Sequence, residues 1–210
     1  KHVLIGGGSK GIGLACAAGF LGEGARVSLV SRDAAHLETA RRTLLERHPG
    51  AEDRIAVFPA NLRDAEAAAI AVEDAERQCG PIDILVNCAG AAKRTPPDEL
   101  TPQHWHEAMD AKYFTYIHLS DPTIKRMAAR GRGSILNVVG SGGKIGKPLH
   151  LPGGAANAAR NHGCAELVWL GTRSIVTLMS AARVAASNRS SAAMPPNKGS
   201  TSRGSATSYP

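Results

Sequence analysis

The sequence near the amino terminus reads Val3-Leu4-Ile5-Gly6-Gly7-Gly8-Ser9-Lys10-Gly11-Ile12-Gly13, an apolar run followed at once by a glycine-dense turn. A strand that runs into such a turn, and then into a helix of small residues, brings bare backbone N–H groups to a phosphate. Gly7 can take backbone angles that a Cβ would forbid, Gly11 lets a pyrophosphate come close, and Gly13 lets the helix lie against the strand. Glycine loops also serve as plain turns, but the βαβ context favours dinucleotide binding.

The next β-rich run, Arg26–Val30, is followed by Ser31-Arg32-Asp33. About 20 residues after the glycines, an acidic side chain would accept a hydrogen bond from a ribose 2′-hydroxyl, whereas an arginine suits a 2′-phosphate. Arg32 occupies this place, position 31 carries no acid, and Lys10 adds a second positive charge. The sequence therefore favours NADP over NAD as the cofactor, with NAD still open.

Composition limits the classes of function. With 210 residues, 43% of them hydrophobic, the chain can bury one sizeable core. No run approaches about 18 apolar residues, so no membrane span or membrane partner is expected. The chain begins inside its first strand, which indicates a missing N-terminal piece rather than a secretory signal. Residues 1–159 carry 19 Lys and Arg against 17 Asp and Glu, so most of the net charge of +7 belongs to residues 160–210. Because the expected folded part is nearly neutral, nucleic-acid binding is not expected.

The cysteines show no C-x-x-C spacing, at positions Cys16, Cys79, Cys88 and Cys164. Cys16 and Cys88 fall on elements that should be buried. The sequence predicts small hydrophobic side chains in a reducing cytoplasm, with no metal site and no disulfide.

Short apolar runs alternate with helical stretches through most of the chain. The expected strands are Val3–Ile5, Arg26–Val30, Arg54–Phe58, Ile82–Val86 and Ser134–Val139. The expected helices are Gly11–Leu21, Ala34–Arg47 with Asp33 as its cap, Asp64–Cys79, and Pro102–Arg130 with a break allowed near Asp121-Pro122. This order predicts an α/β fold with a doubly wound parallel sheet in three αβα layers, whose ligands bind beyond the carboxyl ends of the strands.

Together these motifs resemble the short-chain dehydrogenase/reductase family over about residues 1–160. Gly7-x-x-x-Gly11-x-Gly13 matches its glycine signature, Asn87-Cys88-Ala89-Gly90 its Asn-x-Ala-Gly element, and Asn61-Leu62 its Asp-Val/Leu pair with asparagine replacing aspartate. The resemblance implies a Rossmann-like fold and an adenine-ribose pocket. The residues expected to bind the cofactor are Gly7, Ser9, Lys10, Gly11, Ile12, Gly13, Ser31, Arg32, Asn61, Leu62, Asn87, Ala89 and Gly90.

In that family a tyrosine transfers the proton while nicotinamide transfers the hydride, assisted by a lysine four residues later, a serine and an asparagine. The chain departs from this set, because it contains no Tyr-x-x-x-Lys. Lys112 stands at the asparagine position, Ser141 lies one residue beyond the serine position, and His150 aligns with the tyrosine.

Two interpretations of these three residues stay open. In the first, His150 donates the proton because imidazole titrates near neutrality, Lys112 is an electrostatic or relay group, and Ser141 binds the substrate oxygen. In the second, they are a loop histidine, a solvated helix lysine and a turn serine. Lys144 and Lys147 flank the same loop and would attract an acidic substrate unless they are merely solvated.

The resemblance stops near Ala159, although the family implies a further strand and a Pro-Gly loop after the helix that carries Asn157. The remaining residues are serine-rich and acid-poor, which suggests a shifted reading frame or a truncated product that resequencing the coding region would test. The sheet is accordingly expected to be incomplete at its C-terminal edge. Residues 1–186 are expected to form the NAD(P)-binding domain, with a short apolar element at Leu167–Val176, and residues 187–210 an unstructured tail.

Two functions from different classes follow. The first is an oxidoreductase that transfers hydride between NADP(H) and a small carbonyl or alcohol substrate, as a homo-oligomer by resemblance. The second is a nucleotide-binding protein without turnover, either a pseudoenzyme or a truncated or frameshifted product.

Overall fold

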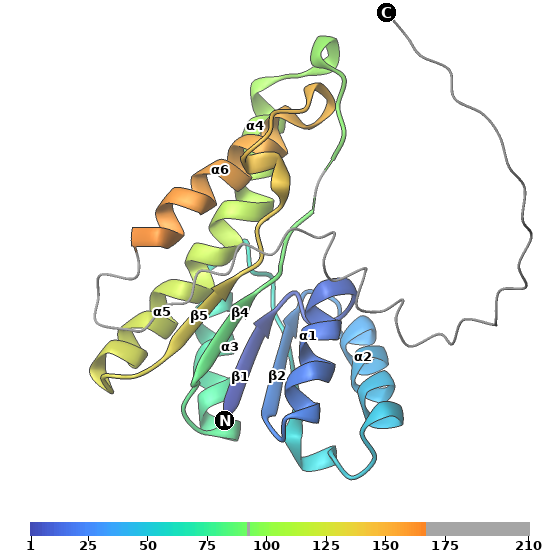
Figure 1. Ribbon diagram of the computed structural model, residues 1–210, viewed down its shortest axis with the longest axis vertical. Helices are drawn as coiled ribbons and strands as arrows, with labels where there is room; N and C mark the ends of the chain where they lie inside the picture. The colour runs from blue at the N-terminus through green and yellow to red at the C-terminus, as the bar shows by residue number, and fades with distance from the viewer. Residues whose placement is uncertain (92, 167–210) are drawn as a thin grey trace, which may run out of the picture.

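One sheet of five parallel strands forms the centre of the computed structural model, which describes residues 1–91 and 93–166 (Figure 1). The strand order is β3-β2-β1-β4-β5. The strands are β1 (His2–Gly6), β2 (Arg26–Ser31), β3 (Ile55–Pro59), β4 (Ile84–Asn87) and β5 (Ser134–Asn137). Because the order reverses at β1, the carboxyl ends of β1 and β4 flank the crevice where open α/β sheets bind ligands.

Helices follow the strands along the chain and cover both faces of the sheet (Figure 1). They are α1 (Gly11–Gly22), α2 (Ala34–Arg47), α3 (Ala65–Cys79), α4 (Pro102–Met109), α5 (Thr115–Ala129) and α6 (Leu151–Glu166). Helices α1 and α2 pack on β1, β2 and β3, and α3 packs against α5 on the other face. Helix α6 packs against α4.

Alternation along β1 divides the core into two layers. Val3 and Ile5 belong to the cluster under α1 and α2, whereas Leu4 belongs to the cluster under α3 and α5. All five residues of β1 are buried, as expected for the central strand of a parallel sheet. The predicted α/β class and the doubly wound parallel sheet are therefore confirmed.

Several predicted boundaries need correction. The expected helix 102–130 is divided by a π-helical segment at Asp110–Phe114, and Pro122 lies inside α5 without ending it. Strand β5 ends at Asn137 rather than Val139, because its ladder with β4 ends at the pair Asn87 and Asn137. Asp33 caps α2 as predicted, since its carboxylate accepts a hydrogen bond from the His36 N–H at 2.9 Å.

Within the described residues, β5 forms one edge of the sheet. The expected apolar element at Leu167–Val176 and the expected tail over 187–210 lie outside the described residues. No helix in the described part is both long enough and apolar enough to cross a membrane.

Candidate functional site

A cavity of about 380 Å³ lies at the carboxyl ends of β1 to β4, where the loops after all four strands meet. All of the predicted cofactor residues except Gly11 and Asn87 line it. The lining residues that the sequence analysis did not predict are Ala60, Arg63, Cys88, Ala91, Ala111 and Thr115. Most of these residues are chain neighbours of predicted residues, so their position in the same loops could have identified them. Ala111 and Thr115 come from the π-helical segment and α5, which are distant in the sequence from the predicted residues.

The turn after β1 is shaped by close backbone contacts. Gly7 has a φ of 77°, and its N–H donates to the Val30 carbonyl at 2.8 Å. A Cβ on Gly13 would lie 2.3 Å from the Gly7 carbonyl oxygen. Only glycine allows the start of α1 to approach the turn this closely.

The amino-terminal end of α1 is free of side-chain caps. Lys10 occupies the N-cap position with extended angles and makes no capping hydrogen bond. Ser9, whose residue type often caps helices, instead donates to the Ser31 hydroxyl at 3.0 Å. The first N–H groups of α1 therefore face the cavity without a side-chain acceptor, which is the arrangement that binds phosphate.

Positive side chains flank this helix end. Arg32 and Lys10 are exposed and line the same cavity. None of the acidic side chains described forms an ion pair with either of them, and Asp33 is engaged at the start of α2. The residues present therefore suit a dinucleotide with an additional phosphate near Arg32.

The floor of the cavity is held by a second set of contacts. Asn61 accepts a hydrogen bond from the Arg63 N–H at 3.3 Å, which fixes the turn after β3. His118 contacts the Leu62 carbonyl through Nδ1 at 3.0 Å, so the carbonyl accepts from the ring N–H and α5 is tied to this loop.

Asn87 is fully buried below the cavity rather than on its surface. Its Nδ2 donates to the Ser120 hydroxyl at 3.0 Å and to Asn137 Oδ1 at 2.9 Å. The side chain thus joins β4 to β5 and α5. Ala89 and Gly90, two and three residues later, do line the cavity.

Lys112 lies in the π-helical segment, between the loop after β4 and the first turn of α6. Its Cγ would be 3.5 Å from a Cβ on Gly90, and its Cε 3.6 Å from a Cβ on Gly153. Burial lowers the pKa of Lys112, and the positive charge of Arg160 lowers it further. Of the two interpretations of Lys112, a fully solvated helix lysine does not match this surrounding, because the side chain is half-buried and its ammonium loses a proton more easily than in water.

No hydrogen bond or ion pair among the described residues joins His150 to Ser141. His150 is half-buried and accepts a hydrogen bond at Nε2 from Arg94 Nε at 3.2 Å. Ser141 is exposed at the start of a 3-10 turn.

A second, smaller cavity of about 170 Å³ adjoins the first, and both share Arg63, Ala91 and Ala111. Its charged and titratable lining residues are Arg63, Lys93, His104 and Glu107. Arg63 and Lys93 form no ion pair among the described residues, whereas Glu107 accepts a hydrogen bond from Gln103 at 3.3 Å. This cavity has no signal in the sequence, because Arg63, Lys93 and His104 are far apart along the chain.

Another cavity, of about 360 Å³, lies at the opposite ends of the strands and is lined by Lys1, His2, Arg26 and Arg54 among others. Arg26 and Arg54 are already bonded there to backbone carbonyls. It lies away from the glycine turn, so we assign the site to the carboxyl edge. No group of three or more His, Cys, Asp or Glu in the described part of the chain could hold a metal ion.

Residues 1–168 match a family model described as short chain dehydrogenase. The gluconate 5-dehydrogenase of Gluconobacter oxydans (strain 621H) is 33% identical over 158 residues, which are 75% of this chain and 60% of that protein. The 5-keto-D-gluconate 5-reductase of Escherichia coli (strain K12) is 29% identical over 159 residues, 76% of this chain and 61% of that protein. The chain thus spans about 60% of the length of the curated relatives it matches.

Among solved structures, the chain is similar to a short chain oxidoreductase from Pseudomonas aeruginosa PAO1 that is described as containing an atypical catalytic center. The apo form matches with a TM-score of 0.76 and 27% identity, over 90% of this chain and 74% of that one. The NADPH-bound form matches with a TM-score of 0.75 and 28% identity, over 91% of this chain and 77% of that one.

Proposed function

Because the chain belongs to the short chain dehydrogenase family, we propose that it is an oxidoreductase that prefers NADP(H) and acts on a carbonyl or alcohol. The observation that carries this proposal is the uncapped start of α1 inside a cavity flanked by Arg32 and Lys10. The cofactor supplies the hydride when bound. The chain's own residues bind its phosphates, hold the substrate beside it and deliver the proton.

The preference for NADP(H) rests on Arg32. A guanidinium can form charge-assisted hydrogen bonds with a 2′-phosphate, and no carboxylate in the turn after β2 competes for it except Asp33, which caps α2. The NADPH-bound relative supports this choice.

The affinity test compares NADPH with NADH by fluorescence titration. We expect Arg32→Ala to weaken NADPH binding roughly tenfold while NADH binding changes little, since one charge-assisted interaction is lost. Arg47→Ala removes the same charge from an exposed position on α2 outside the cavity and should alter neither affinity. Equal losses for both cofactors in Arg32→Ala would contradict the assignment.

For the proton donor we favour Lys112, with His150 as the second candidate. Lys112 lies between Gly90, which lines the larger cavity, and Gly153, which lines the smaller one. Its lowered pKa suits an ammonium that gives up a proton. His150 already accepts a hydrogen bond at Nε2 from Arg94, so only a proton on Nδ1 is available in its neutral form. Ser141 is proposed to bind the substrate oxygen.

The substrate is proposed to be small and negatively charged. The smaller cavity holds only about 170 Å³, and its lining carries Arg63 and Lys93 against one acidic residue, Glu107, which forms no ion pair with either of them in the described part of the chain. Cavities that hold drug-sized ligands are larger, typically above about 300 Å³. The names of two relatives refer to gluconate, a sugar acid, which agrees with this charge.

Turnover is tested by NADPH oxidation with a panel of small keto acids and their neutral esters. We expect the keto acids to react, and the rate of reduction to fall on the alkaline side as Lys112 loses its proton, at a lower pH than for an ordinary lysine. Lys112→Met and Lys112→Arg should both abolish turnover, because neither side chain gives up a proton in this pH range.

His150→Phe separates the two candidate donors. Turnover that survives this substitution supports Lys112, and turnover that is lost only in His150→Phe assigns the proton to His150. NADPH binding without oxidation of any carbonyl supports the second function, a nucleotide-binding protein without turnover, which the absence of Tyr-x-x-x-Lys favours.

A further inference from the structure

Two cysteines from distant parts of the chain are brought together by the glycine turn. Gly13, in α1, lies against the backbone of Gly7. On its other side, Gly7 lies against the loop after β4, where an added Cβ would be 3.0 Å from the carbonyl carbon of Cys88. Cys16 is one helical turn beyond Gly13, so the contacts that let α1 approach the turn also bring Cys16 toward Cys88.

Both side chains lie against the same apolar cluster under α1. Each is half-buried, and Cys88 also lines the larger cavity, so the pair is reached from the proposed cofactor site. Cys79, by contrast, is buried, and lies 3.6 Å from the Ser28 hydroxyl at the other end of the sheet.

The two thiols are close enough to change each other's titration. The neighbouring Cys88 thiol lowers the pKa of Cys16 to about 7, and Cys16, together with burial, raises the pKa of Cys88. A thiol with a pKa near the surrounding pH is close to optimal as an attacking nucleophile, since it combines a large thiolate fraction with retained nucleophilicity.

We propose that Cys16 and Cys88 form a redox-active pair that hydrogen peroxide converts to a disulfide beside the cavity that Cys88 lines. The Cys16 thiolate attacks one peroxide oxygen, the O–O bond breaks, and hydroxide leaves as Cys16 becomes a sulfenic acid. The Cys88 sulfur then attacks the Cys16 sulfur, the S–O bond breaks, and water leaves. Both sulfurs are oxidised and one hydrogen peroxide is reduced to two waters. The hydroxide takes up the proton that Cys16 released when it ionised, and the Cys88 proton joins the hydroxyl group of the sulfenic acid to form the second water.

The new bond changes the geometry of the cavity. The two sulfurs must approach to about 2.05 Å, which draws the loop after β4 toward α1. This loop contacts Gly7 and lines the cavity, so the backbone groups that face the cofactor are displaced. This consequence rests on the proposed function, whereas the formation of the disulfide does not.

The bond is tested on the full chain, reduced and then treated with hydrogen peroxide. The expected product has lost two hydrogen atoms by intact mass, yields a linked peptide pair containing Cys16 and Cys88, and is restored by dithiothreitol. Cys16→Ser and Cys88→Ser should each prevent the link, and Cys79→Ser should not. A sulfinic acid at Cys16 with no link, or a link that involves Cys79 or Cys164 instead, overturns the proposal.

The cofactor consequence is measured by NADPH titration before oxidation, after it and after reduction. We expect oxidation to weaken NADPH binding roughly tenfold, because about one hydrogen bond to phosphate is lost. Reduction should restore the original affinity. Unchanged affinity in a linked sample overturns the coupling to the cavity. A reduced protein that binds no NADPH contradicts the proposed function, while the linkage result still stands on its own.

Discussion

Gly13 is the residue at which one missing side chain matters most for the site. A Cβ there would meet the Gly7 carbonyl oxygen at 2.3 Å and the Gly7 carbonyl carbon at 2.9 Å, and backbone atoms of a tight turn cannot move away cheaply. Gly19 lies in the same helix, is exposed, and has no atom within 4 Å of an added Cβ. The two glycines therefore form a matched pair.

We expect Gly13→Ala to lower the free energy of unfolding by about 2 kcal/mol, since α1 must shift away from the turn. Gly19→Ala should raise it by about 0.5–1 kcal/mol, because alanine loses less conformational entropy in a helix. Urea unfolding of both variants measures the difference. Equal effects at the two positions would mean that the contact at Gly13 is not tight in solution.

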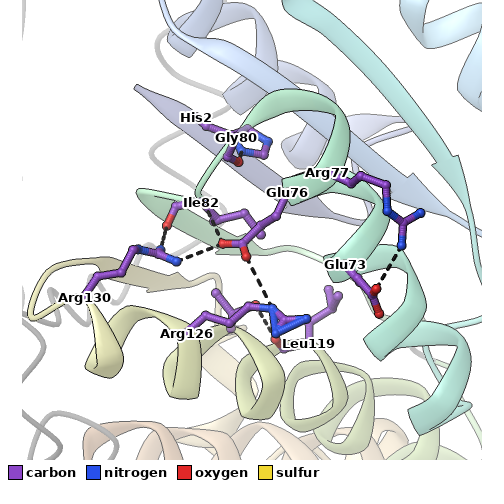
Figure 2. Close-up of polar contacts among 10 residues, drawn as sticks. His2, Glu73, Glu76, Arg77, Gly80, Ile82, Leu119, Arg126 and Arg130 are labelled. Carbon is purple, nitrogen blue, oxygen red and sulfur yellow. Dashed lines mark hydrogen bonds and ion pairs between the residues drawn. The ribbon is translucent and has the colours of Figure 1, made fainter.

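At the scale of elements, Glu76 joins α3 to the end of α5 and to Ile82, just before β4 (Figure 2). Its Oε1 accepts hydrogen bonds at 3.0 Å from Arg130 Nη1 and from the Ile82 N–H, and its Oε2 lies 3.4 Å from Arg126 Nε. Arg130 also donates to the Ile82 carbonyl at 2.7 Å. Glu73, one turn earlier, pairs with Arg77 on the exposed face of α3 and with no other residue in the described part of the chain.

Glu76→Ala should therefore lower the free energy of unfolding by about 2 kcal/mol, as a half-buried, charge-assisted network is lost. Glu73→Ala is the matched control and should change stability little, since exposed ion pairs contribute weakly. Thermal or urea unfolding of both variants provides the comparison, and a Glu73 effect as large as the Glu76 effect would refute this ranking.

At the scale of the whole molecule, His2 makes folding depend on pH. It is buried in β1, where Nδ1 lies 2.7 Å from the Gly80 carbonyl and Nε2 lies 2.8 Å from the Ser28 hydroxyl (Figure 2 labels His2 and Gly80). Because a carbonyl only accepts, the neutral ring carries its proton on Nδ1. Burial lowers the pKa of His2 below 6.5, although the hydrogen bond to Gly80 opposes this.

The unfolded state thus binds a proton at a higher pH than the folded state does. The contribution of His2 to stability is fully present above the unfolded pKa of 6.5 and is lost progressively as the pH falls below it. Urea midpoints measured between about pH 5 and 8 should decrease toward the acid end, and this slope should be smaller in His2→Gln. His36→Gln, at an exposed position, controls for removal of a histidine. An unchanged slope in His2→Gln would exclude His2 as the cause.

The strands, most helices and the glycine turn follow from local sequence. Parallel strands buried on both faces need continuous apolar runs, and the turn needs glycines at fixed places, so both features are visible in the order of residues. The π-helical segment at Asp110–Phe114 has no such signal, because it depends on how α4 and α5 pack against their neighbours.

By itself, the sequence determined the α/β class, the parallel strands, the cap at Asp33 and the place of the glycine turn after β1, because each depends on a short stretch of backbone with a restricted set of residues. Only the tertiary structure decided that Asn87 is a buried brace, that Lys112 is half-buried between Gly90 and Gly153, and that Cys16 lies beside Cys88. These properties arise from contacts between residues far apart in the chain. Burial and proximity across such distances set hydrogen bonding and pKa, and no local pattern encodes them.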